Sequence, residues 1–254
     1  MRSVIWAGCG TAFTFVMTTL GAALVFFFKR RIGDRVQRTC LGFAAGVMAA
    51  AAVFSLLVPA IEQAEQLDGA PWLVTTGGFA LGAAMIAGMD AAMRRLARVR
   101  RAGDAARRQM LMYAAVTLHN IPEGMAVGLA FALAVRDGGL GLAGAVALAL
   151  GIGIQNFPEG AAVALPLRQG GMSRLRAFAL GTLSGAVEPV FGVLAVLAAT
   201  AANQVMPLLM AFSAGAMMYV VIAEMIPEAA GDRMGTRFAM IGYMVMMALD
   251  VALG

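Results

Sequence analysis

Charge is scarce in this sequence of 254 residues. Only 13% of the residues are Asp, Glu, Lys or Arg, whereas soluble globular domains carry about 25%. Hydrophobic residues make up 61% of the chain, and its mean hydropathy is +0.83. This shortage of charge excludes an ordinary soluble domain, and the sequence therefore predicts an integral membrane protein.

Cysteine and histidine are almost absent. Cys9 and Cys40 lie near opposite ends of different apolar segments, so we expect no disulfide and interpret both as small packing residues. His119 is the only histidine. One histidine cannot form the His-Glu-x-x-His motif of a metallohydrolase, in which a bound metal activates water. The sequence therefore predicts a protein that is not an enzyme.

What the chain has in abundance is long apolar segments. A helix of roughly 20 residues crosses the hydrocarbon core of a membrane, which is about 30 Å thick. The segments predict an all-α integral membrane protein with one transporter domain over residues 1–254, built as an inverted repeat. Its eight transmembrane helices are expected at about residues 3–28, 39–62, 70–93, 109–135, 139–167, 175–201, 205–229 and 236–253.

The basic residues fall almost entirely on one side of the predicted membrane. If alternate loops lie on opposite sides, 17 of the 19 Lys and Arg residues share one side, and only Arg2 and Arg136 lie on the other. Basic loops stay in the cytoplasm, so both termini are predicted to lie outside. This orientation, with contacts to anionic lipid headgroups, accounts for the net charge of +5 without a nucleic-acid partner.

Two polar segments interrupt the apolar helices at mid-span. His119-Asn120-Ile121-Pro122-Glu123-Gly124 returns 36 positions later as Gln155-Asn156-Phe157-Pro158-Glu159-Gly160. We call residues 119–124 the first cassette and residues 155–160 the second. Their helices are consecutive and must be antiparallel, so the motif recurs upside down, as it does around the substrate sites of transporters. Each proline also frees a backbone carbonyl, which is tolerated only where protein or a cavity surrounds it.

The cassettes and the helix that follows them carry oxygen and nitrogen donors. The glutamate of each cassette lies four residues after the first donor, so the two side chains share one helical face. The asparagine of each cassette comes directly after the first donor, so its side chain points to a neighbouring position around the helix. A third carboxylate lies at similar depth in the sixth helix. The seven candidate donors are His119, Asn120, Glu123, Gln155, Asn156, Glu159 and Glu188.

These donors suit a divalent cation. Three ionised acids in mid-membrane cost on the order of 7 to 10 kcal/mol unless cations or protons neutralise them. Mixed imidazole, carboxylate and amide donors favour Zn, Fe, Mn, Co, Ni or Cd over Mg or Ca. The alternative is that the polar groups only join helices, each with a contribution of about 0.6 kcal/mol. Duplication in register on two antiparallel helices favours the metal site, and the sequence leaves open whether it holds one ion or two.

With these residues the chain resembles the ZIP (Zrt-, Irt-like protein) family of divalent metal transporters, and most of all its bacterial GufA-like branch. The resemblance covers essentially the whole chain, including both cassettes and Phe43-Ala44-Ala45-Gly46-Val47-Met48 in the second helix. It implies a two-metal centre formed by the seven donors, bridged by Glu123 and Glu159, with Met48 contributing from helix 2. It also implies alternating access, with helices 1, 4, 5 and 6 sliding against helices 2, 3, 7 and 8.

The chain departs from the family at three places. Many relatives have histidine at the position of Gln155, so one ligand is weaker here. Close bacterial relatives have aspartate at the position of Asn156, so the secondary site has lost a charge. Many members also carry a histidine-rich cytoplasmic loop between helices 3 and 4. The corresponding Arg94–Arg108 segment has no histidine, and we expect no metal buffering there.

The resulting hypothesis is transport of divalent transition-metal ions across a bacterial inner membrane into the cytoplasm. Zn²⁺ is the favoured substrate, with Fe²⁺, Mn²⁺ and Cd²⁺ as further candidates. The alternative is a membrane sensor that holds the metal without moving it, and proton coupling and a homodimer are left open. Helix-end acids are candidates for the path, unless they are merely solvated there: Glu62 and Asp250 for an entrance, and Asp90, Glu224 and Glu228 for an exit.

Overall fold

The computed structural model describes residues 2–27, 33–67, 70–99, 104–136, 141–201 and 205–253. The regular structure of these residues is helical, with no strand among them, and eight helices are long and apolar enough to cross a membrane. The predicted all-α fold with eight spans is confirmed. The spans are Arg2–Phe26, Arg38–Glu65, Pro71–Ala92, Val116–Arg136, Leu142–Arg168, Arg174–Ala199, Met206–Ala229 and Arg233–Ala252.

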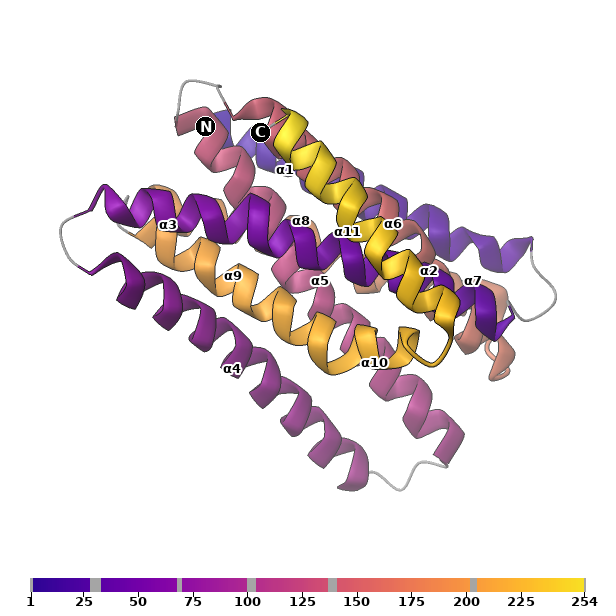
Figure 1. Cartoon of the computed structure of the whole chain (residues 1–254). Coiled ribbons are helices and arrows are strands. Elements are labelled where there is room, and N and C mark those ends of the chain that lie inside the picture. Colours follow the sequence, from indigo (N-terminus) through magenta and orange to yellow (C-terminus); the bar gives the residue numbers. More distant parts are fainter. Residues whose placement is uncertain are drawn as a thin grey trace.

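Several spans consist of more than one helical element (Figure 1). The second and seventh spans each contain a π-helical segment, and the sixth is broken at Ala186. The elements are α1 (Arg2–Ala23), η1 (Leu24–Phe26), α2 (Asp34–Ala51), η2 (Ala52–Leu57), α3 (Val58–Glu65), α4 (Pro71–Val99), α5 (Asp104–Arg136), α6 (Leu142–Gln169), α7 (Arg174–Gly185), α8 (Val187–Ala201), α9 (Met206–Val220), η4 (Val221–Met225), α10 (Ile226–Ala229) and α11 (Arg233–Leu253).

The arginine-rich segment between the third and fourth spans is largely helical, where the sequence suggested a loop. α4 continues to Val99 and α5 begins at Asp104, while residues 100–103 lie outside the described part of the chain. Alanine and arginine are both strong helix formers, so these helices extend past the apolar spans.

α5 is the central helix of the bundle. In the apolar window of its span, 89% of the residues are buried, against 22% for α4 and 17% for α11 at the periphery. Among the eight spans described, the first cassette therefore lies in the most enclosed one.

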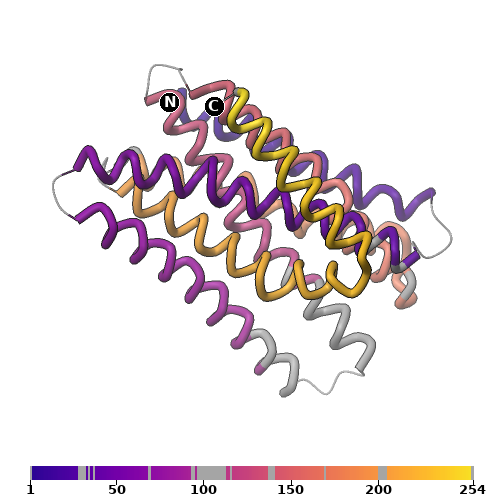
Figure 2. The backbone as a smooth tube through the Cα atoms, viewed as in Figure 1, coloured from indigo at the N-terminus to yellow at the C-terminus, as the bar shows by residue number. Residues whose placement is uncertain are grey.

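The two ends of the chain lie at the same end of the bundle (Figure 2), as an even number of spans requires.

Four pairs of helices pack at backbone distance: α1 with α6, α2 with α11, α4 with α9, and α5 with α8. In each pair a glycine faces a carbonyl of its partner so closely that a Cβ atom would collide with it, which is how small residues bring membrane helices together. The glycines and carbonyls are Gly160 with Thr18, Gly46 with Ala239, Gly82 with Phe212, and Gly124 with Glu188.

The pairing has an internal symmetry. If the first span is exchanged with the sixth, the second with the seventh, the third with the eighth and the fourth with the fifth, each close pair becomes another close pair. This is the pattern of an inverted repeat that extends beyond the two cassettes to the whole bundle. The cassette helices α5 and α6 are exchanged with each other, so they lie about its centre.

The glycine packing predicts opposite effects for two substitutions in α4. Gly82→Ala should destabilise the protein by about 1 to 3 kcal/mol, because the new Cβ atom collides with the Phe212 carbonyl of α9 and the helices must shift. Gly88→Ala on the same helix meets no atom within 4 Å, so it should stabilise by about 0.5 to 1 kcal/mol through its better helix propensity. Thermal unfolding of both variants in detergent checks this, and equal melting temperatures would contradict it.

Candidate metal centre

The two cassettes contact each other through a buried hydrogen bond. Gln155 Nε2 on α6 donates to Glu123 Oε1 on α5 over 2.7 Å, and both residues are fully buried. Pro122 and Pro158 lie inside their helices without ending them, so α5 and α6 pass through the cassettes as continuous elements. The inverted motifs therefore meet side chain to side chain in the interior.

Glu188 joins this group from the sixth span. It lies in the first turn of α8, where the helix dipole favours a negative charge, and it is fully buried. Asn156 Nδ2 donates to Glu188 Oε2 over 2.9 Å, and Thr18 Oγ1 of α1 donates to Glu188 Oε1 over 3.3 Å. Asn120 Nδ2 donates over 2.8 Å to the carbonyl of Ser184, just before the break in this span.

Some polar atoms of the cassettes have hydrogen-bond partners and others have none. The amide N–H groups of Asn120, Gln155 and Asn156 donate to protein oxygens, whereas the amide oxygens of the same side chains have no hydrogen-bond partner. Glu123 Oε2 and both carboxylate oxygens of Glu159 are likewise buried without a partner. Buried acceptors of this kind cost free energy unless a hydrogen-bond donor or a cation satisfies them. The site thus consists of oxygens that suit a cation.

The carboxylates are also close enough to repel one another. Glu123 interacts electrostatically with both Glu159 and Glu188. The His119 side chain interacts with Glu159 in turn. Neutralising like charges in a buried site requires a proton or a counter-ion, so the electrostatics and the unsatisfied oxygens favour the same kind of ligand.

His119 makes a contact that the sequence did not predict. Its Nε2 lies 3.2 Å from Glu224 Oε2. This contact joins α5 to the π-helical segment η4 of the seventh span. His119 is buried, and 23% of the Glu224 side chain is exposed. Glu224, expected from the sequence as an exit residue toward the cytoplasmic end of its helix, therefore adjoins the first cassette. No local signal marks this contact, because it joins two helices that are far apart in the chain.

The remaining predicted residues lie on other helices. Met48 is fully buried on α2. Asp250 Oδ1 of α11 accepts a hydrogen bond from Ser55 Oγ of η2 over 2.6 Å. The remaining three predicted path residues are exposed or partly exposed, on α3, α4 and α10, and they are Glu62, Asp90 and Glu228.

No ready-made cluster of three or more His, Cys, Asp or Glu side chains is found in the part of the chain that the structure describes. The candidate ligands are engaged in pairs instead: Glu123 with Gln155, Glu188 with Asn156, and His119 with Glu224.

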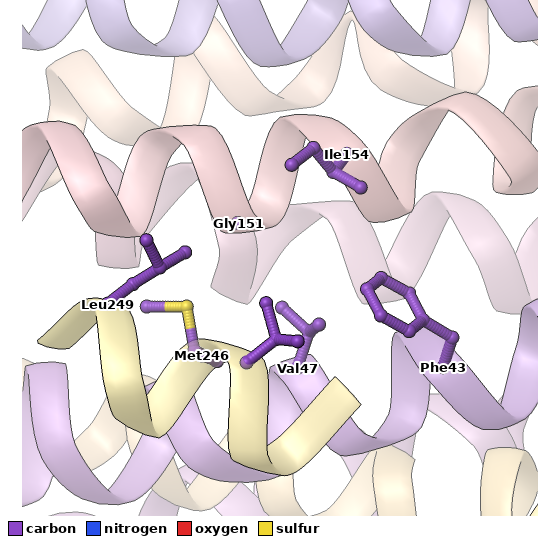
Figure 3. Close-up of a pocket in the computed structure, with 7 residues that line it drawn as sticks. Phe43, Val47, Gly151, Ile154, Met246 and Leu249 are labelled. Carbon is purple, nitrogen blue, oxygen red and sulfur yellow. The ribbon is translucent and has the colours of Figure 1, made fainter. Parts of the chain in front are cut away.

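A small crevice between α2, α6 and α11 is a poor candidate for the metal path (Figure 3). Ile154 lies beside Gln155 in sequence, but it is half exposed while Gln155 is fully buried, so this face of α6 turns away from the cassettes. The crevice is lined only by apolar groups: Phe43, Val47, Gly151, Ile154, Val245, Met246 and Leu249.

Comparison with known proteins finds relatives among the zinc transporters. A family model described as "ZIP Zinc transporter" matches residues 96–250. Zinc transporter ZIP11 of Homo sapiens is 36% identical in an alignment 340 residues long, which covers 99% of this chain and 98% of that protein. Zinc transporter ZIPB of Bordetella bronchiseptica is 38% identical over 259 residues, covering 98% and 82%. Zinc transporter GufA of Myxococcus xanthus is 40% identical over 148 residues, covering 57% and 56%.

The Asn156–Glu188 hydrogen bond predicts how the centre responds to an added charge. Asn156→Asp should lower the stability of the metal-free protein by about 1 to 3 kcal/mol, because a donor is lost and two buried carboxylates face each other. Zn²⁺ should restore more stability to this variant than to the original protein, since the cation neutralises both charges. The measurement is thermal unfolding in chelator and in Zn²⁺.

Asn156→Leu is the matched control for this substitution. It removes the same donor without adding a charge, so it should lose stability while Zn²⁺ restores no more than in the original protein. Equal responses of the aspartate and leucine variants to Zn²⁺ would show that the cation does not bind at this position.

Proposed function

The chain belongs to the ZIP family of zinc transporters, and from this premise we propose that it carries Zn²⁺ across a bacterial inner membrane into the cytoplasm. It is a multi-pass membrane protein and a transporter rather than an enzyme. The observation that carries the proposal is the set of buried oxygens without partners where the two inverted cassettes meet.

The proposed binding step exchanges hydrogen bonds for metal bonds. A cation that reaches Glu123 displaces the Gln155 N–H group from its carboxylate, and the oxygen of the same amide then turns toward the ion. Glu159 offers two oxygens with no protein partner, so it requires no such exchange. Glu123 and Glu159 are the proposed bridges of a two-metal centre, with Met48 contributing from α2.

The remaining proposed ligands complete that centre from the cassettes and α8. Three carboxylates offset much of the charge of two divalent ions, and the amide and imidazole donors are neutral. Because such mixed donors suit borderline cations, Fe²⁺, Mn²⁺ and Cd²⁺ are proposed as further substrates beside Zn²⁺. These ligands are His119, Asn120, Gln155, Asn156 and Glu188.

The proposed exit begins at His119. The 3.2 Å contact between His119 Nε2 and Glu224 Oε2 supports Glu224 as the first acceptor of a departing ion, ahead of Glu228 and Asp90. On the opposite side, Asp250 with Ser55 and the exposed Glu62 are proposed to attract the ion. Both termini are proposed to lie outside, and a homodimer stays a prediction.

The helix packing supports the sliding movement that the family resemblance implied. The close pairs α1 with α6 and α5 with α8 lie within the first group of helices, and α2 with α11 and α4 with α9 lie within the second. Between the groups the contacts run through side chains: Gly151 of α6, for example, packs against the flexible Met246 side chain of α11. Each group of helices can therefore move as a rigid body, while side chains readjust at the interface between the two groups.

Glu123→Gln tests the proposal directly. It preserves shape but removes the charge that holds the ion, so Zn²⁺ uptake into proteoliposomes should fall at least about tenfold, the equivalent of about 1.4 kcal/mol of lost interaction. Glu65→Gln, an exposed acid at the end of α3, is the control and should transport normally.

Two results would contradict the proposal. Normal uptake by the Glu123→Gln protein would remove the cassettes from the path. Zn²⁺ binding by the original protein without any uptake would make it a sensor that holds the metal.

A further inference from the structure

A second pair of repeated segments lies outside the cassettes. Ala45-Gly46-Val47-Met48 of α2 returns as Ala214-Gly215-Ala216-Met217 of α9, and each copy is followed by a π-helical segment and then by a proline, Pro59 or Pro227. α2 and α9 belong to the second and seventh spans, which exchange places in the symmetry of the bundle. Met217 is therefore the inverted counterpart of Met48.

The glycines fix the direction in which both methionines point. A Cβ atom on Gly46 would collide with the Ala239 carbonyl of α11, and one on Gly215 would collide with the Phe79 carbonyl of α4. A residue two positions later lies about 200° round the helix, on the opposite face. Both methionines thus point away from the peripheral helices into the interior, where their exposure is 0%.

Two contacts bring the residues on either side of Met217 against the first cassette. Ser213 Oγ, on the same face of α9 one turn earlier, donates over 2.8 Å to the carbonyl of Pro122. Glu224 Oε2, in the segment that follows α9, lies 3.2 Å from His119 Nε2. Met217 lies between these two points on its helix, so its thioether faces α5 at the cytoplasmic side of Glu123, near the turn that carries His119.

We propose that Met217 is a second thioether donor of the transport path, which the ion meets as it leaves the cassettes toward Glu224. This inference rests on the proposed function and adds a specificity-determining residue to it. A thioether is neutral and soft, so it binds Cd²⁺ and Zn²⁺ in preference to Mn²⁺. A weak neutral donor between the carboxylates and Glu224 lets a soft ion move on without a full exchange of charged ligands.

Met217→Leu tests this role with little change in volume, and such exchanges normally cost less than about 1.5 kcal/mol of stability. In proteoliposomes offered Cd²⁺ and Mn²⁺ together, the preference for Cd²⁺ should fall by about three- to tenfold, as expected when one soft ligand is lost. Met210→Leu is the control, because Met210 is equally buried on nearly the same face of α9, about 10 Å along the helix.

The two leucine variants separate this inference from the proposed function. If Met217→Leu and Met210→Leu keep the same metal preference as the original protein, the role of Met217 is refuted while transport stands. If the original protein takes up no metal at all, the proposed function fails and this inference fails with it.

A binding measurement gives a second readout that does not depend on transport. X-ray absorption of Cd²⁺ bound to a Cys9→Ser/Cys40→Ser protein reports sulfur only from methionine. Adding Met48→Leu should leave a sulfur contribution, and adding Met217→Leu as well should remove it. Loss of all sulfur in the Met48→Leu protein, or its persistence in the protein with both leucines, would overturn the assignment.

Discussion

A carboxylate buried at the centre of a membrane bundle requires a partner, and here the first partner of Glu123 is the amide of Gln155. The glycine that follows each cassette glutamate then brings in a further helix. Gly124 lets the backbone of α8 approach at Glu188, and Gly160 lets α1 approach at Thr18, whose hydroxyl donates to Glu188. The short Pro-Glu-Gly sequence therefore supplies both a buried acid and a glycine at which a neighbouring helix packs closely.

The sequence predicted those features that depend on local pattern. Hydropathy predicted eight spans, and the spacing of His119, Glu123, Gln155 and Glu159 predicted two related faces of donors. It did not predict contacts between helices that are distant in the chain, such as His119 with Glu224 or the hydroxyl of Thr18 with Glu188. The Ala-Gly-x-Met repeat and its following prolines are present in the sequence, but only the pairing of the helices shows that α2 and α9 are equivalent in the inverted repeat.

The hydrogen bonds of the described residues also separate the two groups of helices. Bonds within the first group connect the cassettes with α1 and α8. Two bonds that cross to the second group involve a side chain, Arg136 to Gln63 and Ser213 to the Pro122 carbonyl, and His119 lies close to Glu224 across the same boundary. Side-chain contacts break and reform at small cost, whereas glycine-mediated backbone packing has no such freedom. The boundary between the groups is thus where relative movement meets least resistance.

The amides of Gln155 and Asn156 lower the free-energy cost of the buried carboxylates. In the proposed transport cycle the protein returns without its ion, and its buried acids then lack a counter-charge. Gln155 and Asn156 place N–H donors on Glu123 and Glu188 in that state, which lowers the penalty of buried charge. Both amides keep an oxygen for the ion. Under the proposed function, the same side chain stabilises the empty site through its nitrogen and the loaded site through its oxygen, whereas an ionised aspartate offers no N–H donor.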